Sequence, residues 1–76
     1  MTQTAYILIS CTMGQEQNTL EQIKAIPQIK TAMITYGEYD IVAKIEAGTP
    51  HELAQIISSQ IRQIQQIRST ITLHVV

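Results

Sequence analysis

The chain has 76 residues, of which 45% are hydrophobic, and its formal net charge at pH 7 is −1. That length predicts one domain over residues 1–76. Five Lys and Arg side chains are scattered among six Asp and Glu, so neither a nucleic-acid interface nor attachment to an anionic membrane surface is indicated. No apolar run approaches the roughly 20 residues of a transmembrane helix. A single cysteine, Cys11, excludes an internal disulfide and indicates a cytoplasmic location.

The first half of the chain changes from a strand pattern to a helix pattern and back. A β-branched run over residues 5–9, followed by Ser10-Cys11, predicts a strand. From Gln15, a helical stripe on Leu20 and Ile23 predicts a helix that Pro27 ends. Two strands are then predicted over residues 31–36 and 39–47. The Gly37-Glu38 turn between them makes the pair a hairpin.

The second helix has the clearest start in the chain. Thr49 is expected at the N-cap, Pro50 at the first helical position and Glu52 three residues after the cap, which is a capping box. One apolar face then runs along the helix, on Leu53, Ile56, Ile57, Ile61 and Ile64. A last strand is predicted over residues 70–76, with apolar residues on one face and Thr70, Thr72 and His74 on the other.

An internal repeat supports this order of elements. Residues 22–31, at the end of the first helix, match residues 60–69, at the end of the second. A duplicated βαβ half is the basis of the ferredoxin-like plait. We therefore predict an α+β fold with the order βαββαβ: a four-stranded antiparallel sheet with two helices on one of its faces.

Two helices leave one face of such a sheet uncovered. The first strand is apolar on both faces, because Tyr6 and Leu8 alternate with Ile7 and Ile9. Val42, with Met33 or Ile34, is expected on the uncovered face as well. An apolar surface of this size is more often an interface than bare surface. The sequence thus predicts a homo-oligomer, with dimers formed sheet against sheet.

The residues that commonly carry chemistry are few and separated. Cys11, His51 and His74 lack the spacing of metal ligands, and no nucleophile is set beside a base. No glycine-rich loop leads into a helix. We expect no catalytic residues, no metal and no cofactor.

Two segments together offer groups suited to an amino acid. The hairpin supplies a carboxylate and two phenols, and the entry to the last strand supplies several hydroxyls and the guanidinium of Arg68. An ammonium group requires an anion, and a carboxylate requires donors. The candidate ligand-binding residues are Tyr36, Gly37, Tyr39, Asp40, Ser69, Thr70 and Thr72.

These same segments resemble a known family. Tyr-Gly-Glu-Tyr-Asp-Ile-Val (residues 36–42) is similar to the Gly-x-Tyr-Asp hairpin in the effector-binding (RAM) domain of the Lrp/AsnC transcriptional regulators. Ile-Arg-Ser-Thr-Ile-Thr-Leu (residues 67–73) is similar to the family's closing Val-x-x-Thr-x-Thr strand. The likeness extends from Ala5 to Val76.

The resemblance implies a non-catalytic module that binds amino acids between dimers and assembles further, commonly into octamers. Asp40 would then bind the ligand's amino group, Tyr36 and Gly37 would line the pocket, and Thr70 and Thr72 would complete it. Full-length members carry an N-terminal helix-turn-helix, which this chain lacks. A stand-alone domain is therefore expected, without direct DNA binding, whose partner is a full-length Lrp/AsnC regulator or another protein.

Two alternatives remain open at this point. The first is a small dimeric α+β barrel enzyme, of the isomerase or cofactor-free oxygenase type, for which His74 is the only plausible base. It would require a polar residue in a closed cavity between the sheet and the helices. The second is a purely structural assembly module without a ligand.

Overall fold

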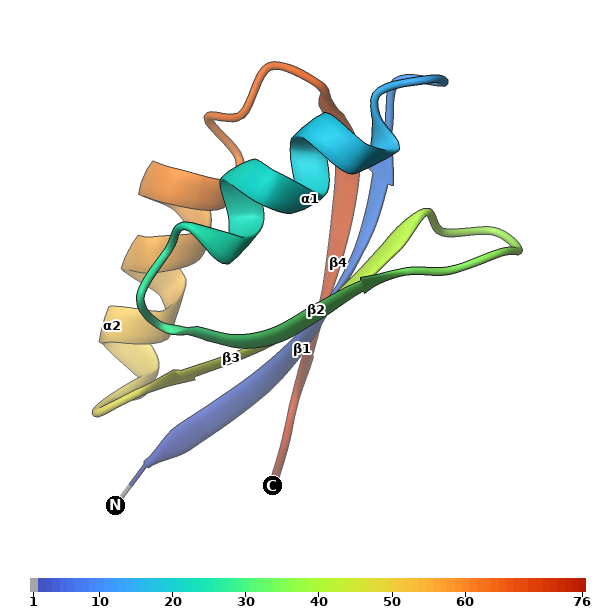
Figure 1. Cartoon of the computed structure of the whole chain (residues 1–76). Helices are drawn as coiled ribbons and strands as arrows, with labels where there is room; N and C mark the ends of the chain where they lie inside the picture. Colours follow the sequence, from blue (N-terminus) through green and yellow to red (C-terminus); the bar gives the residue numbers. More distant parts are fainter. Residues whose placement is uncertain (1) are drawn as a thin grey trace.

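The computed structural model describes residues 2–76; residue 1 of the predicted domain lies outside the described residues. The predicted βαββαβ order is confirmed (Figure 1). The sheet is antiparallel, with the strand order β2-β3-β1-β4 of a ferredoxin-like fold. Its elements, with the π-helical turn η1, are β1 (Gln3–Cys11), α1 (Glu16–Lys24), β2 (Ile29–Ile34), β3 (Ile41–Ala47), α2 (Pro50–Ile56), η1 (Ile57–Ile61) and β4 (Ile67–His74).

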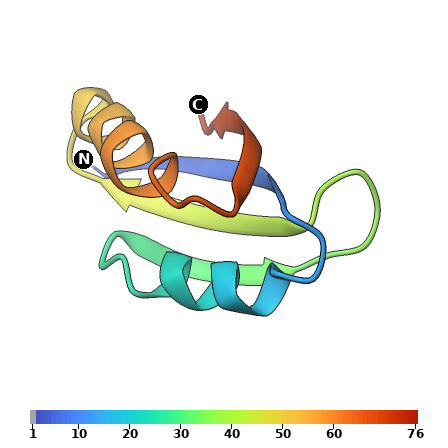
Figure 2. The same cartoon turned by 90° about the horizontal axis from the view of Figure 1, so that it is seen from above.

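Both helices cover the same face of the sheet, here called the inner face (Figures 1 and 2). α1 packs mainly on β2, whereas α2 packs on β3 and β1. Alternate residues of the two central strands point into the core and are fully buried, because strand side chains alternate between faces. These residues are Ala5, Ile7 and Ile9 in β1 and Ile41, Ala43 and Ile45 in β3. Across residues 2–76, no helix is long and apolar enough to cross a membrane.

The opposite face, here called the outer face, is apolar, as predicted. Leu8 pairs with Val42 on one side and with Ile71 on the other. Met33 pairs with Val42, so Met33 takes the outward position that the sequence left open between Met33 and Ile34. Tyr6 and Leu73 extend this surface toward the other end of β1. The outer face is therefore defined by Tyr6, Leu8, Met33, Val42, Ile71 and Leu73.

The start of α2 follows the predicted cap, but its end differs from the prediction. The Thr49 hydroxyl accepts a hydrogen bond of 3.1 Å from the Glu52 amide. The last turn widens into η1, which ends at Ile61 rather than continuing to Ile64. Both Ser58 and Ser59 donate their hydroxyls to the carbonyl of Gln55, at 3.3 and 2.6 Å. Side chains that occupy a helical carbonyl in this way compete with the regular backbone bond.

The internal repeat corresponds to a repeated turn. After α1, the Ile26 amide donates to the Ile23 carbonyl at 3.0 Å, and the Ile29 amide donates to Ile26 at 3.0 Å. After η1, Ile64 bonds to Ile61 and Ile67 bonds to Ile64 in the same way, both at 3.1 Å. The matching residues thus make the same helix-to-strand connection in both halves, which supports the predicted duplication.

The predicted tight turn at Gly37-Glu38 is wrong, because β2 ends at Ile34 and a longer loop spans residues 35–40. The Thr35 amide donates to the Asp40 carbonyl at 2.9 Å, and the Thr35 hydroxyl donates to the Tyr39 carbonyl at 2.9 Å. These bonds close the base of the loop and leave its tip projecting beyond the sheet (Figure 1). β2 and β4 also begin earlier than predicted, at Ile29 and Ile67.

Candidate functional site

Within one chain, the two predicted groups of ligand residues lie at the same end of the sheet with β1 between them. The Asp40 amide donates to the Ile9 carbonyl at 2.8 Å, so Asp40 lies beside β1. Ser69 pairs with Ser10 on the other side of β1. Because neighbouring strands are about 4.8 Å apart, the backbones of Asp40 and Ser69 are separated by roughly 10 Å.

The candidate residues of β4 lie on different faces of the sheet. Thr70 pairs with Ile9 and Thr72 pairs with Ile7. Both isoleucines are buried under the helices, so the two threonines lie on the inner face. Ser69 is offset from Thr70 by one residue and lies on the outer face. Because β1 lies between them, Asp40 and the two threonines of one chain do not line a single pocket.

Asp40 is held by the backbone around it. It is half-buried, and its Oδ2 accepts a hydrogen bond of 2.9 Å from the Cys11 amide. Among the described residues, no hydrogen bond or ion pair involves the other oxygen, Oδ1. The carboxylate is thus fixed in place through one oxygen, and its second oxygen can accept a donor from a ligand.

The other candidate residues of the hairpin differ in their exposure to solvent and in their backbone conformation. Tyr36 is fully exposed near the tip of the loop. Gly37 has a backbone φ of +128°, a conformation that side-chain-bearing residues rarely adopt. Tyr39 is half-buried, and its carbonyl is bound by Thr35. The tip of the loop is therefore an accessible surface on a base that the backbone holds rigid.

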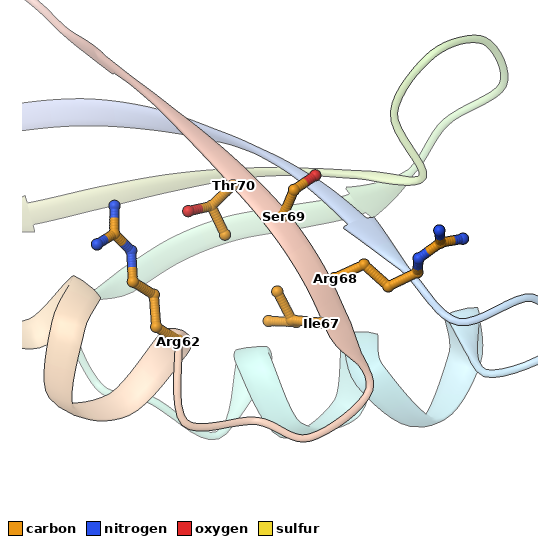
Figure 3. Close-up of a pocket in the computed structure, with 5 residues that line it drawn as sticks. All are labelled: Arg62, Ile67, Arg68, Ser69 and Thr70. Atoms are coloured by element: carbon orange, nitrogen blue, oxygen red, sulfur yellow. The ribbon is translucent and has the colours of Figure 1, made fainter.

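A cleft runs between the α2–η1 segment and the inner side of β4. It consists of two adjoining hollows, of about 380 and 390 Å³, and Arg62 lines both of them. The first hollow also contains Ile67, Arg68, Ser69 and Thr70 (Figure 3). The second is lined by Ala54, Ile57, Ser58, Arg62, Thr72 and His74.

The potential metal ligands do not converge. Within residues 2–76, no three His, Cys, Asp or Glu side chains are grouped as a metal site would require. The Cys11 thiol is buried and free. Burial, and secondarily the negative charge of Asp40, raise the pKa of this thiol. His51 is exposed in the first turn of α2.

Comparison with protein families settles the identity of the fold. The model of the Lrp/AsnC ligand-binding domain matches residues 4–76. The chain belongs to the Lrp/AsnC ligand-binding domain family. This confirms the family that the hairpin and the closing strand predicted.

The curated relatives are of two kinds. An HTH-type transcriptional regulator of Pyrococcus furiosus is 30% identical over 73 residues, which are 92% of this chain and 49% of the regulator. A homocitrate synthase of Sulfurisphaera tokodaii is 43% identical over 51 residues, which are 67% of this chain and 11% of the enzyme. The Lrp/AsnC domain thus spans half or less of the length of these relatives.

Solved structures agree with this assignment. The crystal structure of FFRP-DM1 is 36% identical, with a TM-score of 0.94, and the match covers 97% of this chain and 99% of that one. The complex of the transcriptional regulator NMB0573 with L-Met, from Neisseria meningitidis, has a TM-score of 0.81 at 13% identity. That match covers 97% of this chain and 49% of the regulator, and it shows a shared fold alone.

Sequence reasoning did not find Arg62 as part of the cleft. The pattern placed this residue near the end of a helix but did not indicate which strand the helix faces. The order β2-β3-β1-β4 puts β4 at the edge beside β1, and this order brings Arg62 to Thr70 and Thr72. Strand alternation placed the two threonines on one face of β4, but it did not show that this face is the inner one or that Arg62 lies beside it.

Proposed function

We propose that this Lrp/AsnC domain is a non-catalytic module that binds an amino acid between copies of itself. One observation carries the proposal: in a single chain, β1 lies between Asp40 and the two threonines of β4, Thr70 and Thr72. A ligand as small as an amino acid can contact both groups only if a second copy supplies one of them. Binding and assembly are then linked, since each promotes the other by the same factor.

The first level of assembly is a dimer formed through the outer face. Tyr6, Met33, Ile71 and Leu73 are all more than a third exposed in the single chain. Packing this face against the same face of a second chain would remove that apolar area from water. Assembly of dimers into a larger ring, such as an octamer, would bring the hairpin of one dimer to β4 of the next.

In the proposed site, Asp40 binds the ligand's ammonium through its unoccupied Oδ1. Thr70 and Thr72 supply hydroxyls, with Tyr36, Gly37, Tyr39 and Ser69 around them. The L-Met complex of the Neisseria regulator supports an amino-acid ligand for this fold.

The domain would act through a partner protein. Its curated relatives include HTH-type regulators and homocitrate synthases, so a full-length Lrp/AsnC regulator is one candidate and an enzyme is another. Direct DNA binding is not part of the proposal, because five basic side chains are balanced by six acidic ones. The proposed location is the cytoplasm.

The enzyme alternative has less support. It requires a polar residue inside a closed cavity, whereas His74, its candidate base, is exposed on an edge strand. The purely structural module is the remaining rival, and it differs from our proposal in predicting no ligand.

A thermal-shift screen of the twenty amino acids tests the proposal. We expect at least one amino acid to raise the melting temperature and to increase the mass measured by light scattering. Calorimetry should then show that Asp40→Asn weakens binding of that amino acid about ten- to a hundredfold, and Glu38→Gln, in the same loop, should bind it like wild type. No shift with any amino acid would favour the structural module.

A further inference from the structure

Arg62 is the cation shared by the two hollows of the cleft between α2–η1 and β4. In the part of the chain that the structure describes, neither hollow is lined by Asp or Glu. Within residues 2–76, Arg62 forms no ion pair; the ion pair present there joins Lys44 and Glu46 at 3.5 Å. A guanidinium without a carboxylate partner, in a cleft without acidic lining, gives that cleft a positive potential.

The π-helical turn η1 fixes the backbone position of Arg62. Its amide donates to the Ile57 carbonyl at 2.9 Å, which is the wide hydrogen bond of a π-turn. Ile57 and Ile61 are buried and attach this turn to the core. The backbone that carries the guanidinium is therefore attached to the core.

The side chains around Arg62 differ in direction. In Figure 3 the Arg62 guanidinium and the Thr70 hydroxyl extend to the same side of β4, while the Arg68 guanidinium extends away from them. Thr72, two residues along the same face, lies in the second hollow together with Arg62. One guanidinium and two threonine hydroxyls thus lie along one open cleft.

These groups match a carboxylate better than other anions. The planar fork of a guanidinium donates two parallel hydrogen bonds to a carboxylate, and hydroxyls can donate to the remaining lone pairs. A phosphate carries a charge of about −1.5 to −2 at pH 7 and favours more than one cation. A single guanidinium neutralises the single charge of a monocarboxylate.

We propose that Arg62, with Thr70 and Thr72, binds the carboxylate of a small monocarboxylic acid. The proposal rests on the proposed function for the rest of the ligand, whose ammonium would bind Asp40 of another copy. It assigns the two ends of the amino acid to two copies of the chain, with Arg62 as the residue that selects a free acid over its amide.

NMR titration of the ¹⁵N-labelled protein with simple ions tests this site directly. The probes are acetate, butyrate, inorganic phosphate and butylamine. We expect both carboxylates to shift the Arg62 side-chain Nε–H signal and the amides of Thr70 and Thr72. Phosphate should bind more weakly than butyrate, and butylamine should cause no shift at these residues.

Two variants that each remove one positive charge supply the comparison. Because both side chains are exposed, neither change should alter the fold, and the spectrum of each variant checks this directly. Arg62→Gln should weaken butyrate binding about tenfold or more, whereas Lys30→Gln, which removes a positive charge on β2 at the opposite edge of the sheet, should change it less than about twofold. Equal losses in both variants, or binding that persists in Arg62→Gln, would overturn the assignment.

The remaining outcomes separate this proposal from the proposed function. An amino acid that binds wild type and Arg62→Gln equally, but not Asp40→Asn, overturns the carboxylate site and leaves the proposed function intact. Butyrate bound at Arg62, with no amino acid binding at all, supports the carboxylate site and overturns the proposed function. Phosphate that binds more tightly than butyrate overturns the carboxylate assignment in favour of a phosphate site.

Discussion

The Asp40 carboxylate holds the end of β1, because its Oδ2 accepts a hydrogen bond of 2.9 Å from the Cys11 amide. The pairing of β1 with β4 shifts register between Ser10 and Cys11, so the carboxylate binds the strand where its regular ladder is interrupted. A residue proposed to bind the ligand thus also stabilises the fold. The two roles must be measured separately.

Asp40→Ala should lower the free energy of unfolding by about 1.5–3 kcal/mol, the value of a hydrogen bond to a charged group. Asp40→Asn should cost less, since its amide oxygen can still accept from Cys11. Urea denaturation at a fixed protein concentration measures both. Glu38→Ala, in an exposed position of the same loop, serves as the control and should change stability by less than about 0.5 kcal/mol. Equal effects at the two positions would refute a structural role for Asp40.

Leu8→Glu should dissociate the proposed dimer. Leu8 lies in the middle of the outer face, between Val42 and Ile71, and burying an unpaired carboxylate there costs several kcal/mol. Light scattering should give the 8.5 kDa mass of one chain for this variant and at least twice that mass for wild type. Gln17→Glu, on the exposed side of α1, adds the same charge and should leave the mass unchanged. A wild-type protein that is already a monomer would contradict the dimer itself.

Local sequence rules predicted the parts of the fold that depend on neighbouring residues. Thr49 caps α2 as its spacing with Pro50 and Glu52 predicted, and the alternation of β4 placed Thr70 and Thr72 on one face. The residue at which α2 ends could not be predicted from local rules. The hydroxyls of Ser58 and Ser59 bind the Gln55 carbonyl, and the helix widens into the π-helical turn η1.

The candidate site depended on tertiary relationships that periodicity does not contain. A short Gly37-Glu38 turn was the simplest hairpin, yet Thr35 closes a longer loop through two bonds to residues 39 and 40. The hairpin motif and the closing-strand motif led us to expect Asp40 and Thr70 in one pocket, but the strand order places β1 between them. Arg62 enters the cleft only because β4 is the edge strand nearest the end of η1.

Gly37→Ala should destabilise the protein, whereas Gly48→Ala should not. Gly37 has a φ of +128°, which an alanine adopts only with strain of about 1–3 kcal/mol. Gly48 has no positive φ, and a Cβ there would meet the Glu52 carboxylate at an ordinary 3.5 Å. Thermal unfolding of the two variants measures the difference. If both variants melt like wild type, the loop adopts another conformation in solution.

The Cys11 thiol should make stability fall at alkaline pH. Burial, followed by the charge of Asp40, raises its pKa in the folded protein above the usual value of 9.0. The unfolded chain therefore loses this proton at a lower pH than the folded chain does. The resulting stability is fully present below about pH 9 and is lost as pH rises through the folded pKa. The free energy of unfolding should decrease over that range for wild type.

Comparison with Cys11→Ser isolates this effect from the titration of tyrosines and lysines, which both proteins share. The serine variant has no group that ionises there, so its stability should decrease less steeply above pH 9. A second readout is the rate of alkylation by iodoacetamide, which requires the thiolate. At pH 8 the native protein should react much more slowly than the urea-unfolded chain. Parallel stability curves together with equal alkylation rates would show that the thiol is neither buried nor affected by Asp40.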